Sequence, residues 1–173
     1  MYSQKDPRWS SIRLGTSTRT IGQDGCLLCC VAEILRNTAT RTDPARLNRW
    51  LTLHDGYLGG NRFVFRSVDP LGAIYDATYD WQKTLADIDT VRGLVEDGYH
   101  VILEVGFNPW GKFASHWVIA LDVGVDIEIL DPWLPPDDCY NPISLLASYA
   151  KPTQELGHVI YRAVAYQVDE MPF

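Results

Sequence analysis

The stretch IGQDGCLLCCVAEIL (residues 21–35) places three cysteines within five positions at the start of a predicted helix. Apolar side chains recur through it at helical spacing, which predicts a helix from about residue 25 to residue 36 with one buried face. Asp24 is the expected N-cap, because a short carboxylate before the first turn can accept a hydrogen bond from its free N–H groups. The apolar positions are Leu27, Leu28, Val31, Ile34 and Leu35.

The cysteines of this stretch, together with Cys139, allow several interpretations. A structural zinc site needs ligand pairs from two segments, and the lone C-x-x-C-C here has no second pair to complete it. A thioredoxin-like redox motif would follow a strand, whereas a loop precedes this one. Cys29 and Cys30 are therefore expected to pack as small apolar residues. A disulfide to Cys139 has no support in the sequence, so we predict reduced thiols, with no metal and no cofactor.

Composition and charge exclude several classes of protein. A chain of 173 residues with 46% hydrophobic and 21% charged residues suits one folded domain over residues 1–173. The net charge of −7 and the scattered basic residues argue against a nucleic-acid partner. The sequence has no apolar run long enough for a membrane span and no signal-peptide pattern at its start. The default expectation is a cytoplasmic protein, although a virion-associated or non-classically exported protein would have the same sequence features.

The secondary-structure pattern places helices before strands. TDPARLNRWL (residues 42–51) predicts a helix with Asp43 as N-cap and Pro44 in its first position. Residues 87–98 predict another, and residues 57–82 suggest a mixture of helix and loop. Strands are expected where β-branched and aromatic residues are concentrated, with a short helix in ISLLASYA between the last two. Those strands are residues 99–107, 115–123, 125–133 and 157–168. The order predicts an α+β fold, with N-terminal helices packed on a C-terminal antiparallel sheet.

Two of these strands suggest a histidine–carboxylate pair. A tight hairpin centred between Val123 and Gly124 would place His116 directly opposite Asp131. This register requires a loop of even length, since a shift of one residue would turn the two side chains to opposite faces. A carboxylate in that position can hold an imidazole in one orientation, as in catalytic triads. A buried histidine satisfied within the core is the alternative interpretation.

Cys26 is the residue that could complete such a site. It would lie in the first turn of its helix, where free N–H groups and the helix dipole favour a thiolate. An imidazole beside it would form the thiolate–imidazolium pair that makes cysteine nucleophilic near neutral pH. Gly25 would keep the approach to the sulfur open. The sequence thus predicts Cys26 as nucleophile, His116 as general base and Asp131 as the orienting acid.

Four short motifs carry a family resemblance. They are QKDPRW (residues 4–9), DGC (24–26), HWVIA (116–120) and LDPW (130–133). In this order and spacing, over nearly the whole chain, they resemble the papain-like cysteine peptidases of the bacteriocin-processing (double-glycine) type, especially its stand-alone C39-like branch. The resemblance implies a papain-like fold, no cofactor and the same three catalytic residues.

The resemblance also implies a glutamine that donates a hydrogen bond to the oxyanion. Gln4 fits the N-terminal motif, but it stands 22 residues before Cys26, whereas the family's glutamine precedes the cysteine by only several residues. Gln23 is nearer in sequence and lies directly at the start of the helix. We favour Gln4 and keep Gln23 as the alternative.

The expected function is hydrolysis of a peptide or isopeptide bond through a Cys26 acyl-enzyme. The transporter joined to the bacteriocin processors has no counterpart in these residues, so the expected substrate is cell-wall (peptidoglycan-like) peptide or a protein precursor. The alternative is a catalytically idle structural or binding module of the same fold, such as a phage tail component. A transglutaminase-like or amidase variant of the same chemistry is a third hypothesis. Trp110, Trp117 and Trp133 are expected near the site, and FNPWGKFAS (residues 107–115) is a candidate lid, with Gly106 and Gly111 permitting its movement.

Overall fold

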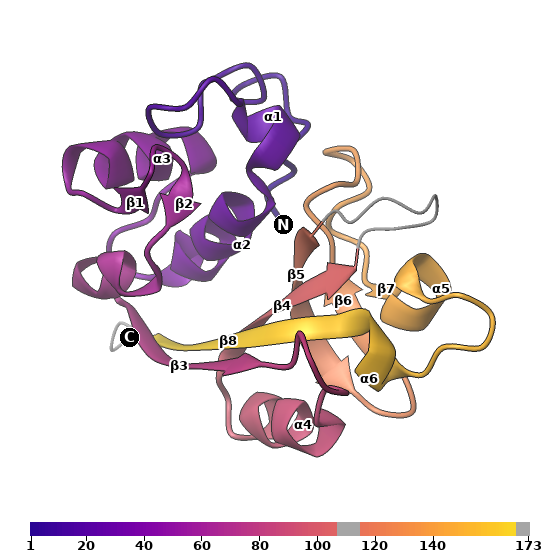
Figure 1. Ribbon diagram of the computed structural model, residues 1–173. Helices are drawn as coiled ribbons and strands as arrows, with labels where there is room; N and C mark the ends of the chain where they lie inside the picture. Colours follow the sequence, from indigo (N-terminus) through magenta and orange to yellow (C-terminus); the bar gives the residue numbers. More distant parts are fainter. Residues whose placement is uncertain (107–114, 169–173) are drawn as a thin grey trace.

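A six-stranded antiparallel sheet carries the C-terminal half of the chain, and a group of helices packs against one of its faces (Figure 1). The computed structural model describes residues 1–106 and 115–168, apart from the side chain of Asn37. Along the sheet the strand order is β3-β8-β4-β5-β6-β7. Their bounds are β3 Ala73–Asp80, β4 His100–Gly106, β5 Ser115–Val123, β6 Ile127–Leu130, β7 Ile143–Ser144 and β8 Ile160–Val168. The predicted combination of helices with an antiparallel sheet is confirmed.

The helices largely follow their local sequence signals. Asp43 caps α3 by accepting a hydrogen bond from the N–H of Arg46, as predicted, and Pro44 is its first residue. The bounds are α1 Ile21–Asp24, α2 Cys26–Ile34, α3 Pro44–Leu53, α4 Ile88–Glu96, α5 Leu145–Tyr149 and α6 Leu156–Val159, with 3-10 turns η1 Leu35–Asn37 and η2 Phe65–Leu71. No helix in the described ranges is long and apolar enough to cross a membrane.

The prediction of Asp24 as N-cap was wrong. Asp24 is the last residue of the short helix α1, and Gly25 occupies the N-cap position of α2. The Asp24 carboxylate instead accepts two hydrogen bonds from Arg19, at 2.7 and 2.8 Å. α1 begins with a capping box between Thr20 and Gln23, a signal that directly precedes α2 in the sequence.

Each face of the sheet covers its own hydrophobic core. Ile102 lies opposite both Ile119 and Val164 in register, and these side chains pack with the buried face of α2. The adjacent positions, such as Leu103 and Val118, turn to the other face, where α4 and α5 cover them. Residues His116 to Ala120 of β5 are therefore buried on both faces, whereas Leu121 and Asp122 are exposed.

The expectation of helix and loop over residues 57–82 was only partly right. This segment contains the small hairpin of β1 (Tyr57–Leu58) and β2 (Arg62–Phe63), then η2, and then the eight-residue edge strand β3. β3 pairs antiparallel with β8, about ninety residues further along the chain. Alanine and aspartate within it lower its local strand signal, so long-range pairing determines its conformation.

The predicted register between β5 and β6 was wrong by two residues. Ile119 pairs with Leu130, which places Asp131 beyond the end of the ladder and diagonal to His116. The connecting loop has three residues, an odd length that by itself would turn His116 and Asp131 to opposite faces. A bulge at Leu121 adds a second shift of one residue and returns the two side chains to the same face.

Candidate active site

Cys26 is the first residue of α2, at the junction with α1. The turn between the two helices is tight, because a Cβ on Gly25 would lie 2.5 Å from the carbonyl oxygen of Ile21. Glycine is thus required there by helix packing, in addition to the open approach expected from the sequence. The Cys26 side chain is 8% exposed and faces a cavity, at the end of α2 where backbone N–H groups have no partner within the helix.

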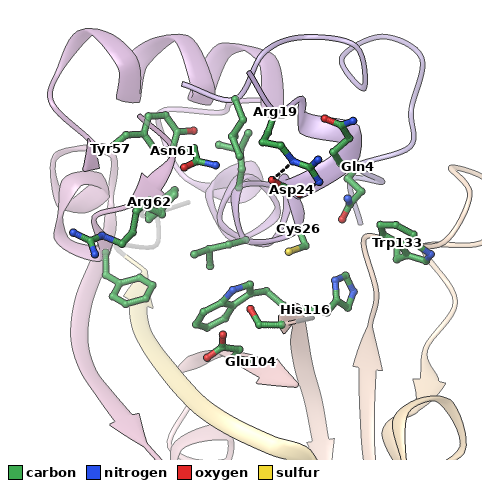
Figure 2. A pocket seen from close by; sticks show the side chains of 18 of the residues that line it. Gln4, Arg19, Asp24, Cys26, Tyr57, Asn61, Arg62, Glu104, His116 and Trp133 are labelled. Carbon is green, nitrogen blue, oxygen red and sulfur yellow. Dashed lines mark hydrogen bonds and ion pairs between the residues drawn. The ribbon is translucent and has the colours of Figure 1, made fainter. Parts of the chain in front are cut away.

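His116 and Asp131 form a buried hydrogen-bonded pair. The distance from His116 Nε2 to Asp131 Oδ1 is 2.7 Å, and both residues are at most 3% exposed. With Nε2 directed at the carboxylate, Nδ1 is the ring nitrogen left for the Cys26 thiol, which lies close enough to the imidazole to raise its pKa. The structure therefore brings together the three residues named from the sequence, and Figure 2 shows Cys26 beside His116.

The Asp131 carboxylate is held from three directions. Its Oδ1 also accepts a hydrogen bond of 2.8 Å from the backbone N–H of Trp133, and its Oδ2 accepts one from the Tyr149 hydroxyl. The Tyr149 ring stacks on the His116 ring, with centroids 5.8 Å apart and planes inclined by 28°. Tyr149 comes from α5, and no sequence spacing connected it to the site.

Electrostatics in this cluster favour an imidazolium beside a carboxylate. Burial by itself opposes the charged imidazolium, but the hydrogen bonds with Asp131 and Cys26 raise the pKa of His116 to about 9. Burial likewise opposes ionisation of Asp131, and the bonds from His116, Tyr149 and the Trp133 backbone lower the pKa of this carboxyl below its usual value.

The two candidate glutamines have different surroundings. Gln4 is 1% exposed, and its backbone N–H donates to the carbonyl of Pro132 at 2.8 Å, which ties it to the loop after Asp131. Its Nε2 donates to the Gly22 carbonyl at 3.2 Å, and its Oε1 is buried without a partner among the described residues. Gln23 is exposed, and its Oε1 accepts from the Thr20 N–H in the capping box. Both line the cavity, but Gln4 is the more rigidly held side chain.

The remaining cysteines are buried free thiols, and the core packing of Cys29 and Cys30 is as predicted. Cys29 and Cys30 are completely buried, and burial raises the pKa of both well above the usual value. Cys139 is 1% exposed, burial raises its pKa as well, and its thiol donates to the Met1 carbonyl at 3.0 Å. Burial therefore keeps Cys29, Cys30 and Cys139 protonated and shielded from solvent. Among the described residues, no group of three His, Cys, Asp or Glu side chains is arranged to hold a metal ion.

A cavity of about 550 Å³ extends away from Cys26 between the helical part and the sheet (Figure 2). Trp133 lies on the His116 side of Cys26, and the centroids of its ring and the imidazole are 6.2 Å apart. Trp117 lies in the cavity wall. The remaining predicted aromatic, Trp110, and nearly all of the candidate lid fall outside the described residues.

No protein-family model matches the chain, and neither the curated proteins nor the solved structures include one that matches it. Interpretation of the site therefore depends on its geometry and chemistry.

Replacement of Tyr149 tests the contact that the sequence did not reveal. Tyr149→Phe keeps the ring but removes the hydroxyl that donates to Asp131, so we expect the free energy of unfolding to fall by about 1 kcal/mol. The pKa of Asp131 should rise, because one stabilising hydrogen bond to its carboxylate is lost. Denaturant unfolding at neutral pH measures the first effect and carboxyl NMR titration the second. Tyr79→Phe is the control, since no hydrogen bond is found for the Tyr79 hydroxyl among the described residues, and its unfolding free energy should stay within about 0.5 kcal/mol.

Proposed function

We propose that this chain is a cysteine hydrolase that cleaves a peptide or isopeptide bond through an acyl-enzyme on Cys26. The observation that carries the proposal is the contact of Cys26, at a helix N-terminus, with an imidazole held by a buried carboxylate. Such an arrangement supports a thiolate and supplies a proton donor beside it. The site opens into a cavity large enough for part of a peptide.

Acylation begins when the Cys26 thiolate attacks the carbonyl carbon and the carbonyl π electrons move onto oxygen. As the tetrahedral intermediate collapses, the C–N bond breaks and the His116 imidazolium protonates the departing amine. In deacylation, neutral His116 accepts a proton from water, whose oxygen attacks the thioester. The carboxylic acid then leaves and the thiolate–imidazolium pair is restored. Asp131 orients the ring in both steps.

Gln4 is the proposed side-chain donor to the oxyanion. One Nε2 hydrogen is engaged by Gly22, and the amide has a second N–H that can point toward the reacting carbonyl. The N–H groups in the first turn of α2, which have no partner within the helix, would provide further donors. Because its position is fixed through both Gly22 and Pro132, Gln4 would need little reorganisation during the reaction.

The resemblance to papain-like peptidases of the bacteriocin-processing type supports the proposal. The cysteine at the start of a helix, the histidine on a strand and the aspartate after the next strand follow the order of the family's motifs. We propose the papain-like fold on this ground, with cell-wall peptide or a protein precursor as the substrate class. An idle module in an assembly such as a phage particle is the competing hypothesis.

Trapping of the acyl-enzyme site by a peptide electrophile tests the proposal. A peptidyl epoxide or fluoromethyl ketone should add one equivalent to Cys26, detected by intact mass and peptide mapping, while Cys29, Cys30 and Cys139 stay unmodified. A panel of fluorogenic peptides and soluble peptidoglycan fragments should then show turnover that the electrophile abolishes. If the electrophile does not modify Cys26 and no peptide or peptidoglycan fragment is turned over, although the protein is folded, the idle module would be favoured.

Substitution of each glutamine distinguishes the oxyanion donor from the helix cap. Gln4→Ala should lower turnover by about a hundredfold or more, because an oxyanion donor is lost, while Cys26 alkylation by a small reagent persists. Gln23→Ala should leave turnover within a fewfold and lower the unfolding free energy by about 1 kcal/mol, because the capping box is lost. Steady-state kinetics and denaturant unfolding on both variants measure these effects. If Gln23→Ala lost turnover and Gln4→Ala kept it, Gln23 would be identified as the donor.

A further inference from the structure

The floor of the cavity contains an ion pair that the proposed mechanism does not use. Glu104 on β4 lies in register between Arg162 on β8 and Trp117 on β5. Arg162 Nε donates to Glu104 Oε2, and the guanidinium lies 5.4 Å from the centre of the Trp117 ring. All three side chains line the cavity that begins at Cys26.

One oxygen of this buried carboxylate is available to a ligand. Glu104 is 4% exposed, and in the described part of the chain its Oε1 has no hydrogen-bond partner, yet protein does not fully enclose it. A buried ion pair adds little net stability compared with apolar residues of similar volume. A carboxylate oxygen that faces a cavity therefore points to recognition of a hydrogen-bond donor.

Aromatic rings form a continuous wall above this floor. Neighbouring ring centroids lie 6.2 Å apart for Tyr57 and Phe63, 6.3 Å for Phe63 and Phe65, and 6.0 Å for Phe65 and Trp117. Such spacings are those of rings in direct contact, so the wall is a continuous aromatic surface against which a further ring can pack from the cavity side. The wall favours a flat apolar side chain, and a glycine would leave the cavity beside it largely empty.

Formal charges in the cavity argue against a charged ligand group. A cationic side chain would meet Arg162, which already pairs with Glu104, and Arg62 at the rim, where Arg19 is paired with Asp24. An anionic side chain would be repelled by Glu104, whose free oxygen can only accept. A neutral aromatic group that carries one hydrogen-bond donor satisfies both the wall and the floor.

We infer that this cavity is a binding subsite for a phenolic, tyrosine-like side chain of the substrate, with its hydroxyl donating to Glu104 Oε1. The placement relative to the scissile bond depends on the proposed function. The leaving amine must reach His116, which lies with Trp133 on one side of Cys26, whereas Tyr57, Asn61 and Arg62 lie on the other (Figure 2). The phenolic residue therefore belongs to the acyl part of the substrate.

Binding to an inactive protein tests the subsite without requiring catalysis. In Cys26→Ser protein, N-acetyl-tyrosine amide should bind at least about tenfold more tightly than N-acetyl-phenylalanine amide, and the glycine, lysine and glutamate amides should bind more weakly still. A site built to bond a hydroxyl discriminates against the analogue that lacks it. NMR titration followed through the Trp117 indole signal reports the affinity and the place of binding.

Two variants separate the wall from the floor. The Glu104→Leu, Arg162→Met double variant of the Cys26→Ser protein removes the acceptor without leaving a buried unpaired charge, and it should abolish the preference for tyrosine over phenylalanine. Phe63→Leu should weaken both ligands alike, with the preference retained. Equal binding of the tyrosine and phenylalanine amides to Cys26→Ser protein, or a preference that persists in the folded double variant without Glu104 and Arg162, would overturn the inference.

Cleavage by the active protein distinguishes failure of the subsite from failure of the proposed function. A set of peptides would carry Tyr, Phe, Lys, Glu or Gly at one of the two positions before the scissile bond. The peptides that carry Tyr should be cleaved fastest. Cleavage without any tyrosine preference would contradict the subsite and leave the hydrolase proposal intact. Selective tyrosine binding by a protein whose Cys26 is unreactive would uphold the subsite and contradict the hydrolase.

Discussion

Cys26→Ala protein is expected to lose peptide hydrolysis by about four orders of magnitude or more, because removal of a catalytic nucleophile eliminates the covalent route. Its stability should change little. The Cys26 side chain is small and lies at the edge of a cavity, so its truncation leaves no enclosed void, and we expect an unfolding free energy within about 1 kcal/mol of the unsubstituted protein. Progress curves with the best fluorogenic peptide and denaturant unfolding measure the two quantities.

Cys30→Ala is the matched control from the same helix. Cys30 is completely buried and its thiol donates to the Trp117 carbonyl at 3.4 Å, so its removal should cost about 1 kcal/mol of stability. Hydrolysis should remain within a fewfold of the original. Loss of activity in Cys30→Ala with full activity in Cys26→Ala would reject the assignment of the nucleophile.

Asp131→Asn is expected to produce the largest loss of stability among the site variants, about 3 kcal/mol near pH 6. The carboxylate is buried and bonds His116, Tyr149 and the Trp133 backbone, and an amide in its place leaves the imidazolium without its charge partner. Hydrolysis should fall together with stability, because the ring loses its orientation. Asp137→Asn, an exposed carboxylate in the same loop, should change stability by less than about 0.5 kcal/mol.

The pH dependence of this difference follows from the two pKa shifts. The pKa of His116 is raised to about 9 in the folded protein, so its contribution is fully present below about pH 6.5 and is lost as the pH rises through 9. The pKa of Asp131 is lowered, so its contribution is present above about pH 4 and is lost as the pH falls through the lowered value. The difference in unfolding free energy between Asp131→Asn and the original protein should therefore be largest near pH 5–6 and become smaller toward pH 10. A gap independent of pH would show that shape, not charge, underlies the stability loss.

Local sequence signals were sufficient for α2, α3, α4 and α5 and for the approximate place of Cys26, but they missed α1 and assigned the residues of α6 to a strand. Asp43 and Pro44 determine the start of α3 within a few residues, and the apolar periodicity after Gly25 determines α2. The contact between His116 and Asp131 was predicted from a hairpin register that was wrong by two residues. It forms because an odd loop and a bulge together preserve the face of the strand.

Contacts between segments that are distant in the sequence could not be predicted from it. Tyr149 reaches Asp131 from α5, and its hydroxyl carries no local pattern. The alignment of Glu104 with Arg162 depends on the pairing of β4 with β8, which joins segments about sixty residues apart. The preference for Gln4 stays a prediction, and its burial beside Gly22 and Pro132 shows how a residue far away in sequence can approach the start of α2.

The rate of Cys26 alkylation as a function of pH tests the central claim most directly. Iodoacetamide should label Cys26 rapidly and selectively at pH 6–7, with Cys29, Cys30 and Cys139 protected by burial. His116→Ala should lower the Cys26 rate at pH 6.5 by at least about tenfold, because the imidazolium that stabilises the thiolate is removed. Slow labelling of Cys26, at a rate that His116→Ala leaves unchanged, would contradict an activated thiol and with it the proposed hydrolase.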